Sequence, residues 1–125
     1  MAHSYHPPTL VIPNFVDPKM DYLNILGIFF AAIAAVVLLC VVASPRGQKF
    51  AFTWMVVTGL IHCITEGYWV FNWKTIPAGS NFFDEVWKEY AKSDSRYMWG
   101  ETTVLGIEGI TAVSLSKGSL NLIFL

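Results

Sequence analysis

Charge and cysteine are both scarce in this 125-residue chain. Only 14% of the residues are charged, the formal net charge is −1, and the two cysteines are Cys40 and Cys63. This balance offers no basic patch, so we expect no nucleic-acid partner. Both cysteines lie inside apolar runs, and there is no paired CxxC, glycine-rich phosphate loop or other metal-ligand spacing. We therefore expect no disulfide framework, no metal site and no cofactor.

Hydrophobic residues are abundant instead, at 54% of the chain, and the mean hydropathy is +0.50. This is typical of an integral membrane protein. Apolar runs at about 23–43, 50–73 and 102–125 each approach the ~20 residues that a helix needs to cross a bilayer. We predict an all-α integral membrane fold with three transmembrane helices. A secretory signal competes for the first run, but the run is too long and the preceding segment is not basic.

The segments outside the apolar runs have their own patterns. Residues 1–22 hold four of the six prolines, which predicts an extended N-terminal segment before a single membrane domain over 23–125. Arg46 and Lys49 favour a cytoplasmic loop between the first two spans. A later loop also carries four cations, so the orientation stays open.

Residues 82–92 have the spacing of an amphipathic helix, with Asn81 as a plausible N-cap. We expect this helix to lie on the membrane surface or to pack over the ends of the spans. Its predicted apolar face holds Phe83, Val86, Trp87 and Tyr90, and its predicted solvated face holds Asp84, Glu85, Lys88, Glu89 and Lys92.

Ionisable residues interrupt the second and third apolar runs. His62 and Glu66 are four residues apart and share a helix face with Trp69, and Glu108 lies one turn before Thr111. An ionisable group at the centre of a span costs ~2.5 kcal/mol or more and indicates a functional site. The alternative is a structural hydrogen bond between helices. Two such acids favour the functional interpretation. The nearby aromatic residues mark the membrane interface or wall a flat apolar ligand.

Three motifs stand out: Gly59-Leu-Ile-His62-x-x-x-Glu66-Gly67, Trp87-Lys-Glu-Tyr90-Ala-Lys-x-Asp94-Ser-Arg96-Tyr97 and Glu108-Gly-Ile-Thr111-Ala112. Together they resemble the emopamil-binding protein family, the sterol Δ8–Δ7 isomerases or cholestenol Δ-isomerases of the EXPERA group. The likeness covers residues 50–112, and its aromatic and loop details are closer to plant than to animal members.

This resemblance implies a multi-pass endoplasmic reticulum membrane protein of sterol biosynthesis, built as a five-helix bundle. It implies an isomerase that needs no redox cofactor. One proton is added to a sterol ring double bond, a carbocation forms, and a proton leaves the neighbouring carbon. The implied partners are a sterol substrate and membrane lipid, and a homo-oligomer is left open.

The resemblance also implies roles for individual residues. His62, Glu66 and Glu108 are the implied catalytic set that handles protons and stabilises the cation, with Thr111 orienting Glu108. Which of His62 and Glu66 delivers the proton, and which removes it, stays open. The implied substrate-binding residues are Tyr90, Arg96 and Tyr97, to which we add Trp69 as an aromatic wall.

The chain departs from the family after the third apolar run. Members continue through a fourth and a fifth span, whereas this sequence reaches Leu125 soon after the segment 116–120. We therefore expect a version that is incomplete at its C-terminus. The alternative function is a non-catalytic relative that binds sterols or cationic amphiphiles, or that associates with a full-length partner. A plain structural membrane subunit is a third hypothesis.

Overall fold

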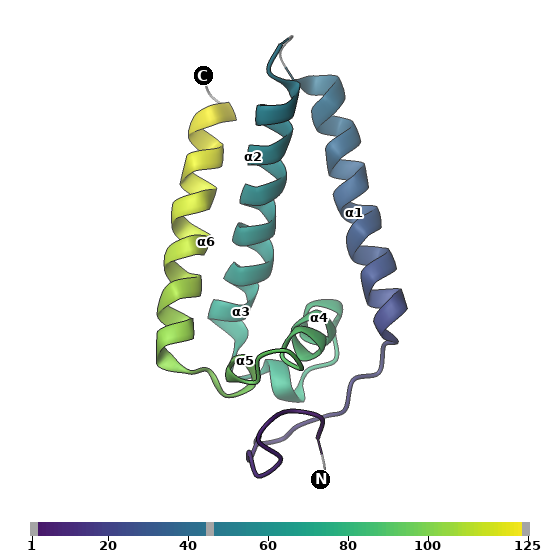
Figure 1. The fold of residues 1–125 in the computed structure, drawn as a ribbon, viewed down its shortest axis with the longest axis vertical. Helices are drawn as coiled ribbons and strands as arrows, with labels where there is room; N and C mark the ends of the chain where they lie inside the picture. The colour runs from purple at the N-terminus through teal and green to yellow at the C-terminus, as the bar shows by residue number, and fades with distance from the viewer. Residues whose placement is uncertain (1–2, 45–46, 124–125) are drawn as a thin grey trace.

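The computed structural model describes residues 3–44 and 47–123, without the side chains of 115–116 and 119–123, and its regular structure is entirely helical. Three long helices stand beside one another, and the short helices and the N-terminal segment gather at one end (Figure 1). The elements are α1 (Tyr22–Ala43), α2 (Lys49–Ile61), a π-helical turn η1 (His62–Glu66), α3 (Gly67–Asn72), a 3-10 turn η2 (Ile76–Ala78), α4 (Phe82–Tyr90), α5 (Arg96–Trp99) and α6 (Thr102–Ile123).

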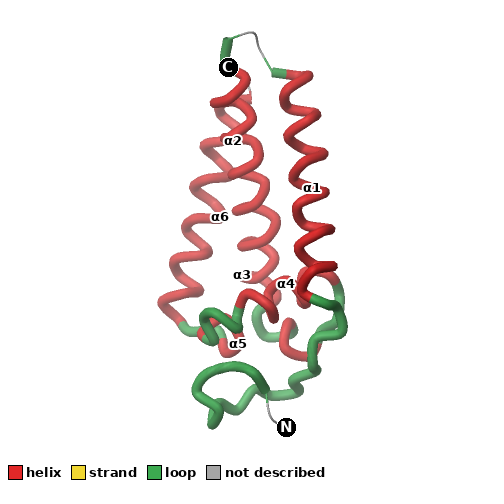
Figure 2. The backbone as a smooth tube through the Cα atoms, turned by 45° about the vertical axis from the view of Figure 1, so that its right-hand side comes forward, coloured by secondary structure: helices red, strands yellow, loops and turns green. Residues whose placement is uncertain are grey.

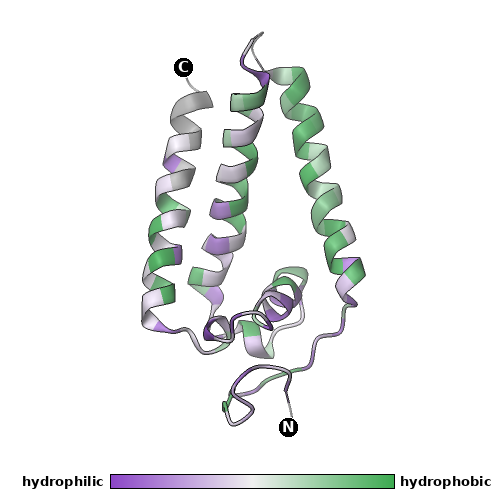
Figure 3. Cartoon of the chain, viewed as in Figure 1, coloured by the Kyte–Doolittle hydropathy of each residue, from purple (hydrophilic) through white to green (hydrophobic). Residues whose placement is uncertain are grey.

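Two helices are long and apolar enough to cross a membrane. They are α1, with 22 residues, and the continuous rod Lys49–Asn72 formed by α2, η1 and α3, with 24 residues. Hydrophobic positions follow α1 along most of its length, whereas hydrophilic bands interrupt α2 and α6 (Figure 3). The coarse prediction of an all-helical fold with membrane-spanning helices is thus supported.

The third predicted span is not confirmed. In α6 the apolar stretch that the structure describes is Thr102–Ser114, which is shorter than a span. The predicted end of this span at residues 124–125 lies outside the described residues, as does Arg46 of the predicted cytoplasmic loop. The third span therefore stays a prediction.

The predicted amphipathic helix is α4, and it packs over the ends of the spans. Asn81 caps it as expected, in a capping box in which Asn81 accepts from the backbone N–H of Asp84 and the Asp84 carboxylate accepts in return. The indole N–H of Trp87 donates to the carbonyl of Thr65 at 3.0 Å. This bond ties α4 to η1, so the position of α4 and the conformation of η1 are coupled.

The predicted solvated face of α4 is wrong for three of its charged residues. Asp84, Glu85 and Lys88 are buried. The N-terminal segment 3–20 runs beneath the short helices and covers this face (Figure 2). Helical periodicity shows which residues of α4 share a face. It contains no information about a segment about 70 residues away that packs on the charged face.

Backbone groups of the N-terminal segment, together with the Gly79 carbonyl, bond one carboxylate oxygen of Glu85 and the Lys88 ammonium. The Glu85 carboxylate accepts from the N–H groups of residues 19–20 at 2.7 and 3.0 Å. The Lys88 ammonium donates to the carbonyls of Val16 and Gly79 at 2.8 and 2.6 Å. Buried charges are tolerated when they are paired and hydrogen-bonded. The two side chains therefore pin the N-terminal segment to α4.

Candidate functional site

The site begins at the π-helical turn of the second rod. The chain from His62 to Glu66 winds as a π-helix between α2 and α3. Within this turn His62 Nδ1 is hydrogen-bonded to Glu66 Oε1, as their spacing predicted. Short π segments inside α-helices often occur at functional sites, because the wider turn alters where side chains point.

A residue of α6 holds the other oxygen of Glu66. The Thr111 hydroxyl donates to Glu66 Oε2 at 2.6 Å. The expected partner was the Glu108 carboxylate, but Thr111 approaches Glu108 only at its backbone carbonyl, 3.1 Å away. The expectation that Thr111 orients the Glu108 side chain is therefore wrong, because α6 packs against η1 and brings this hydroxyl to Glu66.

Glu108, one turn before Thr111 on α6, has a different partner. The Tyr97 hydroxyl of α5 donates to Glu108 Oε1. Burial raises the pKa of the Tyr97 phenol, and the neighbouring Glu108 raises it further. The hydroxyl therefore stays protonated at neutral pH. The Tyr97 ring stacks on Trp87 at 5.1 Å between centroids, which fixes the hydroxyl in place.

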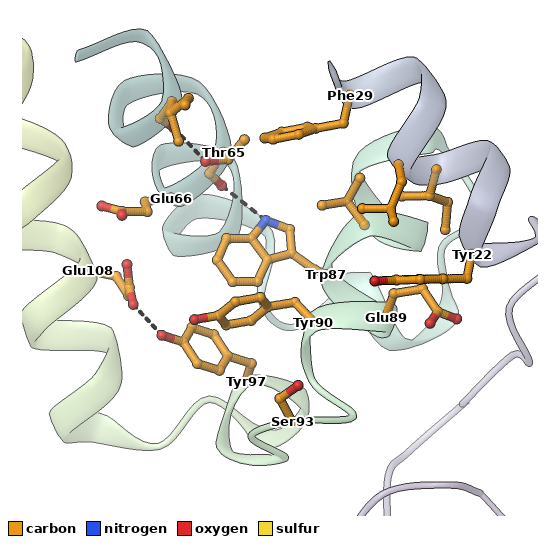
Figure 4. A pocket seen from close by; sticks show the side chains of 14 residues that line it. Tyr22, Phe29, Thr65, Glu66, Trp87, Glu89, Tyr90, Ser93, Tyr97 and Glu108 are labelled. Carbon is orange, nitrogen blue, oxygen red and sulfur yellow. Dashed lines mark hydrogen bonds between the residues drawn. The ribbon is translucent and has the colours of Figure 1, made fainter. Parts of the chain in front are cut away.

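Both acids line a cavity of about 450 Å³, within the ~300–1,000 Å³ common for small-molecule sites. Figure 4 shows the two carboxyl groups on one side and the aromatic rings of Trp87, Tyr90 and Tyr97 beside them. The remaining lining residues come mainly from α1 and α4. They are Tyr22, Ile25, Leu26, Phe29, Ile61, Thr65, Val86, Glu89 and Ser93.

The other predicted site residues do not line this cavity. His62 and Thr111 are each hydrogen-bonded to Glu66, which lines the cavity. Trp69 is fully buried behind it and donates its indole N–H to the Tyr97 carbonyl at 2.9 Å. Arg96 pairs with Asp94 at 2.6 Å and is exposed. Of the predicted set, the structure thus gathers the two acids and two tyrosines at one cavity and leaves Arg96 apart.

Sequence reasoning missed the contribution of α1 to the cavity wall. Tyr22, Ile25, Leu26 and Phe29 line it, yet the last three belong to an almost entirely apolar run with no periodic signal, and Tyr22 precedes that run. The helical pattern puts Trp87 on the apolar face of its helix and gives it no role in the site. The motif offers a signal for such a role, because Trp87 begins the same motif that contains Tyr90 and Tyr97.

Comparisons with known proteins give relatives of two kinds, 3-beta-hydroxysteroid-Delta(8),Delta(7)-isomerases and synthases of protoglabretal or isomeliandiol. A probable 3-beta-hydroxysteroid-Delta(8),Delta(7)-isomerase from Arabidopsis thaliana is 36% identical over 129 residues, covering 99% of this chain and 58% of that protein. A protoglabretal synthase from Ailanthus altissima is 37% identical, covering 94% and 58%. The 3-beta-hydroxysteroid-Delta(8),Delta(7)-isomerase of Cavia porcellus is 29% identical, covering 89% and 52%. No protein-family model matches the chain. The chain thus spans little more than half the length of these curated relatives.

Proposed function

Because the chain belongs to the emopamil-binding protein family of 3-beta-hydroxysteroid-Delta(8),Delta(7)-isomerases, we propose that it shifts a sterol ring double bond from the Δ8 to the Δ7 position. One observation carries the proposal: Glu66 and Glu108 meet at the wall of an apolar cavity between the helices.

The reaction needs a proton donor, a proton acceptor and negative charge near a ring cation. A proton is added to carbon 9, the cation forms at carbon 8, and a proton leaves carbon 7, so protons balance and no electrons are exchanged with a cofactor. The rings of Trp87, Tyr90 and Tyr97 add cation–π stabilisation to the charge of the acids. Desolvation in the cavity strengthens each of these electrostatic interactions.

The hydrogen bonds suggest how the two acids divide the work. Both oxygens of Glu66 are held, one by His62 and one by the Thr111 hydroxyl, an arrangement suited to an acceptor carboxylate. Glu108 lines the same cavity as Glu66, and the structure gives its carboxylate a hydrogen bond from the Tyr97 hydroxyl at Oε1. We therefore assign proton delivery to Glu108, and proton removal and cation stabilisation to Glu66.

The test is production of Δ7-sterol by membranes that lack this activity, express the chain and receive a Δ8-sterol. Glu66→Gln and Glu108→Gln should each lower turnover by about 10²-fold or more, the usual contribution of a general acid or base. Glu101→Gln is the matched control. It makes the same chemical change at the start of α6, but Glu101 does not line the cavity. A wild-type chain that gives no Δ7-sterol would reject the proposal for this polypeptide.

Two alternatives have specific support. The chain is 37% identical to a protoglabretal synthase and 36% identical to the plant isomerase, so the formation of protoglabretal or a related product fits the same similarity. The second alternative is a non-catalytic form that binds sterols or cationic amphiphiles or joins a full-length partner, because a cavity with apolar walls and two acids can bind such a ligand without turnover. Saturable sterol binding without turnover selects the second alternative.

The proposed setting follows from the same function. A sterol substrate dissolves in lipid, and residues of both rods that are long and apolar enough to cross a membrane line the cavity. We propose a multi-pass protein of the endoplasmic reticulum membrane in which α6 forms the third span. Membrane lipid and a second copy of the chain remain proposed partners.

A further inference from the structure

The cavity that holds the two acids adjoins a second cavity between α1 and α2. The first has a volume of about 450 Å³ and the second about 180 Å³. Phe29, Ile61 and Thr65 line both, so the two spaces share a wall. Together they form an elongated site rather than a round one.

Polar groups are distributed unevenly along this site. Figure 4 places Glu66 and Glu108 on one side of the first cavity and Tyr22 and Glu89 on the opposite side. The Glu89 carboxylate is held there by the Lys92 ammonium at 2.5 Å. The second cavity has no charged wall, and every residue that lines it except one threonine is hydrophobic.

The two cavities also lie at different depths along the spans. Tyr22 is the first residue of α1, and Glu89 belongs to α4, which packs at the ends of the long helices. The second cavity lies farther along, beside residues 29–36 of α1 and 57–65 of α2 and η1, with Phe82 and Phe83 from the start of α4 at its wall. A hydroxyl group is costly to move into hydrocarbon, whereas an apolar tail is stabilised there. The polarity of the elongated site therefore follows the polarity of the bilayer around it.

We propose that the substrate lies with its ring hydroxyl toward Tyr22 and Glu89 and its apolar tail in the second cavity, between α1 and α2. The identity of the ligand rests on the proposed function. In this pose the ring system lies in the first cavity, whose opposite wall carries Glu66 and Glu108, and a sterol keeps the orientation it has in the bilayer. The second cavity then limits the length and branching of the tail.

Filling the second cavity tests this pose. Ala32 lines it, so Ala32→Phe places a ring in the space of the tail. Ala31→Phe is the matched control, because the adjacent Ala31 lies on the same helix and is exposed like Ala32, but lines neither cavity. Binding is measured in phosphatidylcholine nanodiscs with a radiolabelled Δ8-sterol and with an analogue that lacks the side chain. Ala32→Phe should lower the affinity for the tailed sterol by about tenfold or more and leave the affinity for the tail-less analogue unchanged.

A second pair of ligands tests the proposed contact between the ring hydroxyl and Glu89. Glu89→Ala should lower the affinity for a 3-hydroxy sterol relative to its 3-deoxy analogue, because only the first can bond the carboxylate. The pose is overturned if Ala32→Phe affects both ligands equally or neither, or if the wild-type chain binds no sterol.

Turnover separates the pose from the proposed function. Tail-dependent loss of binding without any Δ7 product supports the pose and rejects the isomerase. Turnover without tail dependence rejects the pose alone.

Discussion

Replacing Lys88 with methionine should release the N-terminal segment from α4. The Lys88 ammonium is fully buried, bonds two backbone carbonyls and lies 4.0 Å from the equally buried carboxylate of Glu85. Methionine keeps most of the side-chain volume but leaves Glu85 as an uncompensated charge. Removing one partner of a buried ion pair typically costs about 3–5 kcal/mol. The free energy for opening this contact should fall by that amount.

Hydrogen exchange at the Val16 amide measures the opening directly. This N–H donates to the Pro77 carbonyl at 2.9 Å, so it exchanges when the N-terminal segment lifts, and neither Glu85 nor Lys88 is its partner. A loss of about 3–5 kcal/mol corresponds to exchange at least ~100-fold faster. Helical circular dichroism should stay near the wild-type value, because α1, α2 and α6 do not depend on this contact.

The control is Lys92→Met, which removes a lysine that is 40% exposed and paired with Glu89. A pair at such a surface contributes about 0–1 kcal/mol, so exchange at Val16 should change little. In the Lys88→Met background, Glu85→Gln removes the charge but keeps an oxygen for the two backbone N–H groups, and most of the loss should be recovered. Equal exchange in Lys88→Met and Lys92→Met, or no recovery in the double variant, would refute the reasoning.

Three further outcomes are expected. Tyr97→Phe removes the donor to Glu108 while keeping the ring, so kcat for Δ7-sterol formation should fall about tenfold or more with the thermal midpoint little changed; an unchanged kcat contradicts the assigned role. Gly100→Ala should destabilise the fold by more than ~1 kcal/mol, because φ is 64° and a Cβ would lie 2.2 Å from the Trp73 ring; a thermal midpoint equal to wild type would contradict this. Trp87→Phe removes the indole N–H that donates to a carbonyl of η1, and the free energy of unfolding should fall by about 1–3 kcal/mol. Denaturant titration in detergent measures this change, and wild-type stability would show that α4 and η1 are independent.

The sequence was informative wherever a local pattern was enough. Hydropathy located the two rods, and the i,i+4 spacing of His62 and Glu66 predicted a contact that the structure shows. Asn81 indicated the start of α4 because a capping residue acts within one turn. Glu108 stood out because an acid in an apolar run is rare. These features depend on residues that are neighbours in sequence.

Other features depend on contacts between distant segments, and only the tertiary structure decided them. Thr111 bonds Glu66, 45 residues away, because α6 packs against η1. The α1 wall of the cavity is equally invisible in a run where almost every residue is apolar. Lys88 was expected in solvent, yet it bonds the Val16 carbonyl, 72 residues away.

Composition and local spacing thus determined that the chain is helical, that it contains rods able to span a membrane, and which acids are costly there. They could not determine which groups face those acids, because side-chain partners are set by how helices pack and not by their periodicity. A buried charge needs a partner, but its own sequence neighbourhood does not say which segment supplies it. Only the packing of the helices brings the two acids, the threonine and several aromatic residues together in one site.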